Sequence, residues 1–382
     1  FDRSGDRLRE RVALGALLLI IGVATFIAVS SNGADALAYR GAAERLLATG
    51  SPYRPEQLVG PYDPAGGLRY LYPPLFALFL VPLLLLPPVG AIILFALTSI
   101  LASYAACYLV LRHGGLRRGL ALPGAVLAVA CLQPALEDAI NGNVSALLAF
   151  AVAVVIAGSA RLSGAVVAVA AMIKLTPAAL LPAIVARGRQ SIVAAIVTAT
   201  LLIATTLPFL RAYGEYPTVL ANLIAFGPAK RFASSAPADI ARELLGSDLY
   251  APLRAITLLL AVGCLALAIF AGLTRRRETA LLAGLYGSLL LPATLWTHYL
   301  LAPAVLTLSL AVRSTRRRGL GLLLTGAAAL TLPFLLQWPP LLLLSLPLLL
   351  ICSFEAALRL DAGQRELRER DRAQAVELAL EA

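Results

Sequence analysis

"VALGALLLIIGVATFIAVS", residues 12–30, is followed directly by "SNGADALAYRGAAERLLATGSPY", residues 31–53. The first stretch carries no charge and has close to the length of about 20 residues that a helix needs to cross a bilayer. The second stretch is more polar and places an aspartate, Asp35, shortly after the apolar run ends. This order predicts a membrane-spanning helix that leads an acidic residue to the membrane surface.

The composition of the whole chain supports a membrane protein. Of the 382 residues, 60% are hydrophobic and only 14% are charged, and the mean hydropathy is +0.84. One soluble core cannot enclose that much apolar surface. A cleaved signal peptide is the alternative for the first apolar run, but the run is longer than the roughly 7–15 residues of a typical signal core. We therefore predict an all-α polytopic membrane protein.

Apolar segments of helical length recur along the chain, without the alternation that barrel strands require. They predict twelve transmembrane helices, so that both termini lie on one side of the membrane. The predicted spans are 12–30, 89–111, 119–133, 144–160, 163–174, 176–187, 190–210, 251–273, 279–296, 299–312, 319–337 and 340–358.

The basic residues segregate as the positive-inside rule requires. Most of the 32 Lys and Arg residues lie at the two termini and in alternate loops, which become the cytoplasmic side of a plasma membrane in this topology. The formal charge of +11 is therefore attributed to topology and to contact with anionic lipid headgroups. Nucleic-acid binding is not expected.

The longer polar segments then lie on the outer side, at 31–88, 133–145 and 211–250. Residues 1–358 read as a single transmembrane domain whose outer loops form the functional face. The charged tail, 359–382, predicts an amphipathic helix on the cytoplasmic side. Any chemistry is expected on the outer face, because the inner loops are short and merely basic.

"ADALAYRGAAERLLATG" predicts a juxtamembrane helix that ends at the glycine and proline of "TGSPY". Asp35 and Tyr39 are four residues apart and share a face of this helix, so the Tyr39 hydroxyl can orient the Asp35 carboxylate. Asp35 is a candidate catalytic base. The alternative is an N-cap, since an aspartate in a first helical turn is favoured by the helix dipole.

Two further outer motifs offer polar side chains. Tyr72 precedes a Pro-Pro pair that can start a helix, and we expect a short helix over 74–86 rather than a span. Arg69 and Tyr72 are placed at headgroup level, where an aromatic belt is an equally good explanation. In "AINGNVSALL", Asn141 and Asn143 can donate to sugar hydroxyls, or Asn143 can cap the next helix.

Lys174 lies between two apolar halves of about a dozen residues each, and Thr176 and a proline follow it. A lysine in mid-membrane costs about 2.5–3.5 kcal/mol on insertion scales, so it needs a partner or a polar cavity. A broken hairpin would place Lys174 at the outer turn, where it could hold a phosphate. His298 and its neighbour Trp296 lie between two spans on the same side. The four cysteines show no metal-ligand spacing, and neither a metal nor a cofactor is expected.

These blocks, in this order, resemble the polyprenyl-phosphate-mannose-dependent mannosyltransferases of glycosyltransferase family 87, which belong to the GT-C class. The blocks that carry the resemblance are Asp35-x-x-x-Tyr39 with "LLATGSPY", "YPPLFALFLVPLLLLP", "NGNVSALL", "AAMIKLTPAALL" and "LWTHYLLAP". The resemblance spans roughly residues 10–350. The 211–250 loop and the tail carry no matching motif, and many relatives have a second histidine where this chain has Tyr299.

The resemblance implies a GT-C-type bundle with juxtamembrane helices in the first outer loop. It also implies an inverting transfer of mannose from polyprenyl-phosphate mannose, as a substrate, to a lipid-linked glycan or phosphatidylinositol mannoside. Asp35 would be the base and Lys174, with Arg69 as a weaker candidate, would hold the phosphate. The resemblance assigns the acceptor side or base positioning to Tyr39 and His298, and sugar contacts to Asn141 and Asn143.

Three alternatives stay open from the sequence. A secondary transporter would suit twelve spans and a broken helix, although the second interruption of an inverted repeat is missing. A non-catalytic lipid-handling protein would leave Asp35 only a capping role. A related enzyme could use another polyprenyl-phosphate sugar, such as arabinofuranose.

Overall fold

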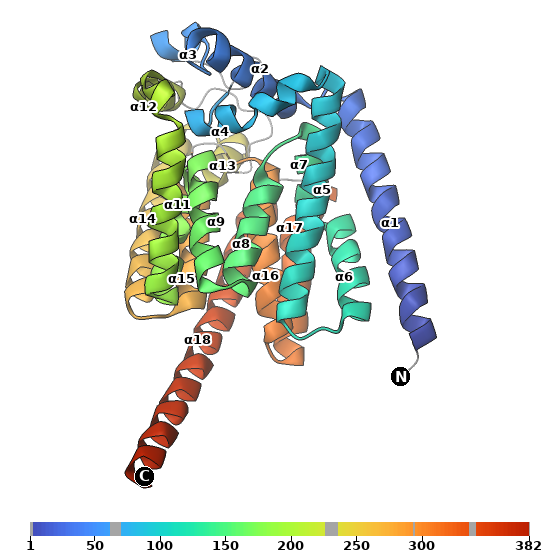
Figure 1. The fold of residues 1–382 in the computed structure, drawn as a ribbon, viewed down its shortest axis with the longest axis vertical. Helices are drawn as coiled ribbons and strands as arrows, with labels where there is room; N and C mark the ends of the chain where they lie inside the picture. The colour runs from blue at the N-terminus through green and yellow to red at the C-terminus, as the bar shows by residue number, and fades with distance from the viewer. Residues whose placement is uncertain (1–2, 62–69, 226–235, 293–294, 336–340, 382) are drawn as a thin grey trace.

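The computed structural model describes residues 3–61, 70–225, 236–292, 295–335 and 341–381, and this part of the chain is helical with no β-strand. Figure 1 shows a bundle with two distinct ends. The upper end carries α2 (Ala34–Thr49), α3 (Pro55–Val59), α4 (Pro74–Phe79) and α12 (Leu210–Ala225). The start of α1 and the end of α18 both lie at the lower end. The all-α prediction is confirmed.

Three described helices are long and apolar enough to cross a membrane: α1 (Arg3–Ser30), α5 (Pro88–His113) and α14 (Tyr250–Leu273). The number rises to five if two bent pairs each count as one span. These pairs are α6 (Arg118–Cys131) with α7 (Gln133–Asn141), bent by 71°, and α11 (Arg189–Thr205) with α12, bent by 58°. Each of the twelve predicted spans overlaps a described helix, but about twelve crossings remains a prediction.

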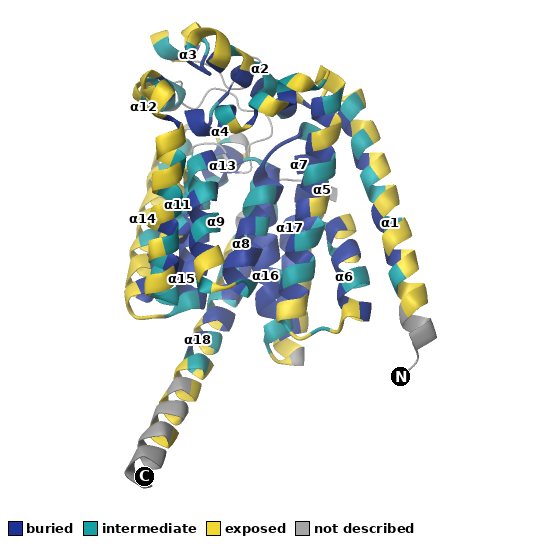
Figure 2. Ribbon diagram, in the orientation of Figure 1, coloured by how far each residue is buried: buried dark blue, intermediate teal, exposed yellow. Residues whose placement is uncertain are grey.

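The bundle packs around α8 (Ser145–Ala157), whose alanines and valines are buried on most sides, while α1, α11 and α14 expose their outer faces (Figure 2). The other helices of the bundle are α9 (Ala160–Ile173), α10 (Leu181–Arg187), α13 (Pro237–Leu245), α15 (Arg277–Leu290), α16 (Leu301–Arg313), α17 (Arg316–Leu335) and α18 (Leu342–Glu381). Short 3-10 turns connect several of them, at Val81–Leu85, Thr176–Leu180, Leu207–Phe209, Ser247–Leu249 and Thr297–Leu300.

Small residues set the closest helix contacts. A Cβ added at Gly164 of α9 would lie 1.9 Å from the carbonyl oxygen of Ser191 in α11, and one at Gly284 of α15 would lie 2.0 Å from that of Ala179. Lipid tails are as apolar as leucine side chains, so close backbone packing of this kind, rather than water exclusion, favours helix association in a bilayer. These contacts fix the hairpin that carries Lys174 against its neighbours.

Three local predictions agree with the structure. The first outer helix is α2, which ends at Gly50 in the left-handed conformation. The segment 74–86 forms the short α4 and the turn Val81–Leu85. The hairpin is broken after Ile173, as predicted. The tail is helical, but it continues the apolar part of α18 in one helix of 40 residues and extends beyond the lower end of the bundle (Figure 1).

Candidate active site

Asp35 lies in the first turn of α2, at the upper end of the bundle. The helix begins after Gly33, whose left-handed φ of 41° turns the chain out of α1, so Asp35 is not the N-cap. Its Oδ2 accepts a hydrogen bond of 2.5 Å from Nδ2 of Asn143, which is distant in sequence. The structure therefore brings the first outer motif and the NGN motif together.

The backbone around Gly142 explains this contact. Gly142 has a φ of 70°, and a Cβ at this position would lie 2.7 Å from the Cβ of Ala36, next to Asp35. Only glycine tolerates both the left-handed conformation and this approach. α7 ends there and the next residue, Asn143, is directed at α2.

The amide of Asn143 is oriented from both sides. Its Oδ1 accepts from the backbone N–H of Val144 at 2.7 Å and of Ser145 at 3.2 Å, at the start of α8. An amide that accepts through Oδ1 must present its donor, Nδ2, on the other side, and that donor faces Asp35. The side chain of Asn143 thus both caps the start of α8 and binds Asp35.

Asp138 is a site residue that the sequence reasoning missed. Its fully buried carboxylate accepts from the N–H of Ser145 at 3.0 Å and of Ala146 at 3.1 Å, beside the Asn143 cap. It holds the start of α8 in place and therefore positions Asn143. The sequence could have indicated this role, because Asp138 lies in the outer polar segment a few residues before the start of a helix. The first N–H groups of a helix lack acceptors within the helix, and a carboxylate can supply them.

The tyrosines form a cluster behind Asp35. The Tyr39 hydroxyl donates to the Tyr72 hydroxyl at 2.9 Å, and Nδ2 of Asn143 lies 3.4 Å from the same Tyr72 oxygen. The expectation that Tyr39 binds Asp35 directly is therefore wrong, because its hydroxyl is engaged by Tyr72 and the donor to Asp35 is Asn143. The Tyr72 backbone is itself fixed, since its carbonyl accepts from Tyr53 at 2.9 Å.

Lys174 follows the last residue of α9 in extended conformation, as predicted for the outer turn of the hairpin. Its Nζ lies 3.4 Å from the centre of the Tyr299 ring and 5.6 Å from the centre of the Tyr72 ring. Tyr299 was treated in the sequence only as a departure from a histidine pair, so its contact with the lysine was missed. A cation on an aromatic face is stabilised without losing its charge.

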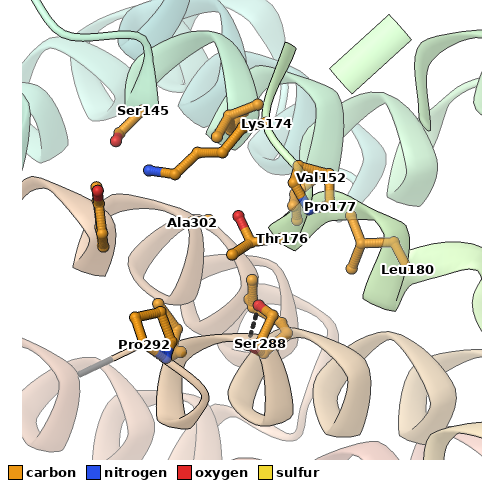
Figure 3. A pocket seen from close by; sticks show the side chains of 13 residues that line it. Ser145, Val152, Lys174, Thr176, Pro177, Leu180, Ser288, Pro292 and Ala302 are labelled. Carbon is orange, nitrogen blue, oxygen red and sulfur yellow. Dashed lines mark hydrogen bonds between the residues drawn. The ribbon is translucent and has the colours of Figure 1, made fainter. Parts of the chain in front are cut away.

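Lys174 and Thr176 line a cavity of about 50 Å³, together with Ser145, Tyr299 and Pro292. Figure 3 shows the lysine side chain extending across it, with Ser145 and Thr176 nearby. Ligand pockets usually measure about 300–1,000 Å³. A bound sugar phosphate therefore needs these walls to separate.

His298 is buried beside this cavity. Its ring centre lies 4.8 Å from that of Tyr299, and neither ring nitrogen has a hydrogen-bond partner among the described residues. A buried imidazole without hydrogen bonds costs free energy, so both nitrogens are available to polar groups of a substrate. Trp296 is half-buried next to it, before the turn Thr297–Leu300.

The remaining candidates are less informative. Asn141 is half-buried at the last position of α7 and does not join the described hydrogen bonds around Asp35. Arg69 lies outside the described residues. Within the described ranges, no group of three or more His, Cys, Asp or Glu side chains could hold a metal ion.

The electrostatics suit a proton acceptor. Burial raises the pKa of the Asp35 carboxyl above its ordinary value, while the hydrogen bond from Asn143 and the charge of Lys174 both lower it. A carboxylate with a raised pKa is a stronger base, and Asn143 and Lys174 both favour its ionised form.

The comparisons with known proteins identify the family of the chain. The family model "Glycosyltransferase family 87" matches residues 70–297, more than half of the chain. The matched region includes Tyr72, Asn143 and Lys174, whereas Asp35 precedes it. No curated protein and no solved structure matches the chain. Apolar helices and a family match of this extent lead to one conclusion: the chain is a membrane protein that belongs to glycosyltransferase family 87.

Proposed function

We propose that this glycosyltransferase moves mannose from polyprenyl-phosphate mannose to a glycolipid acceptor, either a lipid-linked glycan or a phosphatidylinositol mannoside. The reaction takes place on the outer face of the plasma membrane and inverts the anomeric carbon, giving an α-mannoside. The observation that carries the proposal is the contact of Asn143 with Asp35, next to a lysine at the same end of the bundle.

Asp35 acts as the general base. It removes the proton of an acceptor hydroxyl as that oxygen forms a bond to the anomeric carbon. The bond from this carbon to the phosphate oxygen breaks, and its electron pair leaves with the polyprenyl phosphate. The donor is an anionic phosphodiester, and the departing polyprenyl phosphate is a monoester that gains one more negative charge, so its departure needs nearby cationic and amide donors.

Lys174 holds that phosphate. Its ammonium group rests on the Tyr299 and Tyr72 rings, at the edge of the cavity that Thr176 also lines. The ammonium group can leave the two rings and bind a phosphate oxygen instead. Because the rings are neutral, this exchange leaves no charged side chain without its partner. Arg69 is the weaker candidate for the same group.

The other predicted residues take binding roles. His298, with two unpaired ring nitrogens, and Trp296 line the acceptor or the mannose. Tyr39 supports the site through Tyr72 rather than through the base. Asn143 positions Asp35, and Asn141 contacts sugar at the rim.

The charge distribution and the two ends of the molecule support the proposed topology. Both termini lie at the lower end in Figure 1, where the basic loops also lie, and Asp35 lies at the upper end. The positive-inside rule then makes the termini cytoplasmic, in a multi-pass plasma-membrane protein. The partners are membrane lipids, the lipid donor and the glycolipid acceptor.

The experiment is transfer by the purified protein in liposomes with polyprenyl-phosphate mannose and candidate acceptors. Product with mannose and none with polyprenyl-phosphate arabinofuranose is the expected result. Product from the arabinofuranose donor alone would show that the proposed donor sugar is wrong, while the protein would still be a glycosyltransferase. No transfer from either donor to any acceptor, by protein that is folded, would contradict the proposal. The non-enzyme alternatives are set aside, because the family implies a glycosyltransferase.

A further inference from the structure

A second cavity lies at the end of the bundle opposite Asp35. It has a volume of about 340 Å³ and lies between the α16–α17 connection and the middle of α18. Three arginines line it, namely Arg313, Arg318 and Arg359, and Glu355 is the one acidic side chain on its wall. Nothing in the proposed transfer uses this cavity.

The charges on the wall are not balanced. Arg359 forms an ion pair of 2.9 Å with Glu355, so these two side chains offset each other. Arg318 is exposed at the rim. Arg313 donates through Nη2 to Glu278 at 3.0 Å, but its buried Nη1 has no hydrogen-bond partner among the described residues. A buried guanidinium donor without an acceptor costs free energy that an anion in the cavity would recover.

The start of α17 adds a partial positive charge to that of the arginines. Ser314 and Thr315 line the cavity immediately before α17, and Arg318 belongs to its first turn. The first N–H groups of a helix lack acceptors within the helix and carry a partial positive charge. Hydroxyls, guanidinium groups and a helix start thus converge on one space, which is how proteins bind phosphate.

The rest of the wall is mostly apolar, with Thr325 as the exception. Leu322 of α17 and Cys352, Ala356 and Leu360 of α18 line the cavity beside the arginines. A free phosphate ion would gain nothing from these side chains, whereas a lipid could lay its first acyl carbons on them. Basic pockets between helices at the cytoplasmic side are typical sites for anionic lipid headgroups.

We propose that this cavity is a binding site for the phosphate group of an anionic phospholipid, held by Arg313, Arg318 and the first turn of α17. The apolar wall favours a lipid over inorganic phosphate as the source of that group. The site is separate from the phosphate position at Lys174, because it lies at the other end of the bundle.

The test measures binding of dioctanoyl phosphatidylglycerol to the full chain in detergent by native mass spectrometry, with dioctanoyl phosphatidylcholine and inorganic phosphate as the other two probes. Wild type should bind one phosphatidylglycerol with saturation and at least about tenfold more tightly than phosphatidylcholine. The double variant Arg318→Gln/Arg359→Gln should lose about tenfold in affinity for phosphatidylglycerol. Both side chains are exposed, so the fold should tolerate the change.

The matched control is Arg161→Gln/Arg365→Gln, which removes the same charge from exposed positions outside the cavity. Its affinity should stay within about twofold of wild type. If millimolar inorganic phosphate displaces the lipid, the cavity is an anion site for which free phosphate is a sufficient ligand. If it does not, the acyl chains contribute to binding, which supports a lipid as the ligand. Equal loss in both double variants, or wild-type affinity in the cavity variant, would overturn the proposal.

Discussion

The two ends of the bundle differ in the partners of their buried carboxylates. At the lower end, Glu278 is fully buried and its Oε1 accepts from Arg277 at 2.5 Å and from Arg313 at 3.0 Å. Asp361 of α18 accepts from the N–H groups of Glu278 and Thr279 at 3.1 and 2.9 Å. At the upper end, Asp35 has a single amide donor and His298 has no partner among the described residues.

The difference separates residues that hold the fold from residues that are poised for a ligand. Paired charges at the lower end join α15, α16 and α18. Incompletely paired groups at the upper end cost stability, and such local costs are common at functional sites. The predictions below change one end and follow the effect on both stability and transfer.

The largest effect is expected from Glu278→Ala. It leaves two partly buried arginines without their carboxylate, and breaking a buried pair in this way costs about 3–5 kcal/mol. Unfolding of the purified protein in detergent should show this loss in the free energy of unfolding, while the transfer rate per folded molecule stays within about twofold. Glu10→Ala removes the half-buried partner of the exposed Arg118 and should change little. Equal unfolding free energies for the two variants would contradict the comparison.

Gly142→Ala should disturb the upper end by about 1–3 kcal/mol. The new Cβ meets Ala36 at 2.7 Å and strains a φ of 70°, so Asn143 is pushed away from Asp35. The control is Gly50→Ala, which carries the same kind of strain at a φ of 78° but meets open space. Transfer should fall several-fold more in Gly142→Ala than in Gly50→Ala; similar rates would show that the close approach does not matter.

Lys174→Ala should raise the KM for the lipid donor by about tenfold, equivalent to about 1.4 kcal/mol, with a smaller change in kcat. Lys174→Arg keeps the charge and should restore part of the affinity. Arg40→Ala, which removes a cation of α2 that forms an ion pair with Glu44, serves as the control. An unchanged donor KM in Lys174→Ala would remove this lysine from the phosphate site.

The smallest effect concerns pH. The base must be ionised, so kcat/KM should fall as the pH drops through the pKa of Asp35, which burial raises above the ordinary value of about 3.9. Removing the amide donor with Asn143→Ala takes away a contact that lowers this pKa, so the acid limb should move to higher pH. A limb that stays in place, or moves to lower pH, would contradict the assigned contact.

The sequence predicted the helical class, the helix that begins at Ala34 and the break after Ile173. It also selected Asp35, Asn143 and Lys174, whose roles stay predictions. Local signals carry these features, namely apolar length, glycine and proline positions and costly polar residues in apolar runs. It misplaced the Tyr39 hydroxyl and overlooked Asp138 and Tyr299. Those three depend on contacts between segments far apart in the chain, which helical spacing cannot report.

The central claim is that Asp35 is the base of the transfer reaction. The most direct test is the single-turnover transfer rate of Asp35→Asn from polyprenyl-phosphate mannose, measured together with its thermal unfolding. Asparagine keeps the size and the hydrogen-bonding capacity of the side chain but cannot accept the proton. We predict a rate about 10²–10⁴-fold below wild type with an unfolding temperature at least as high. A wild-type rate in this variant would contradict the claim.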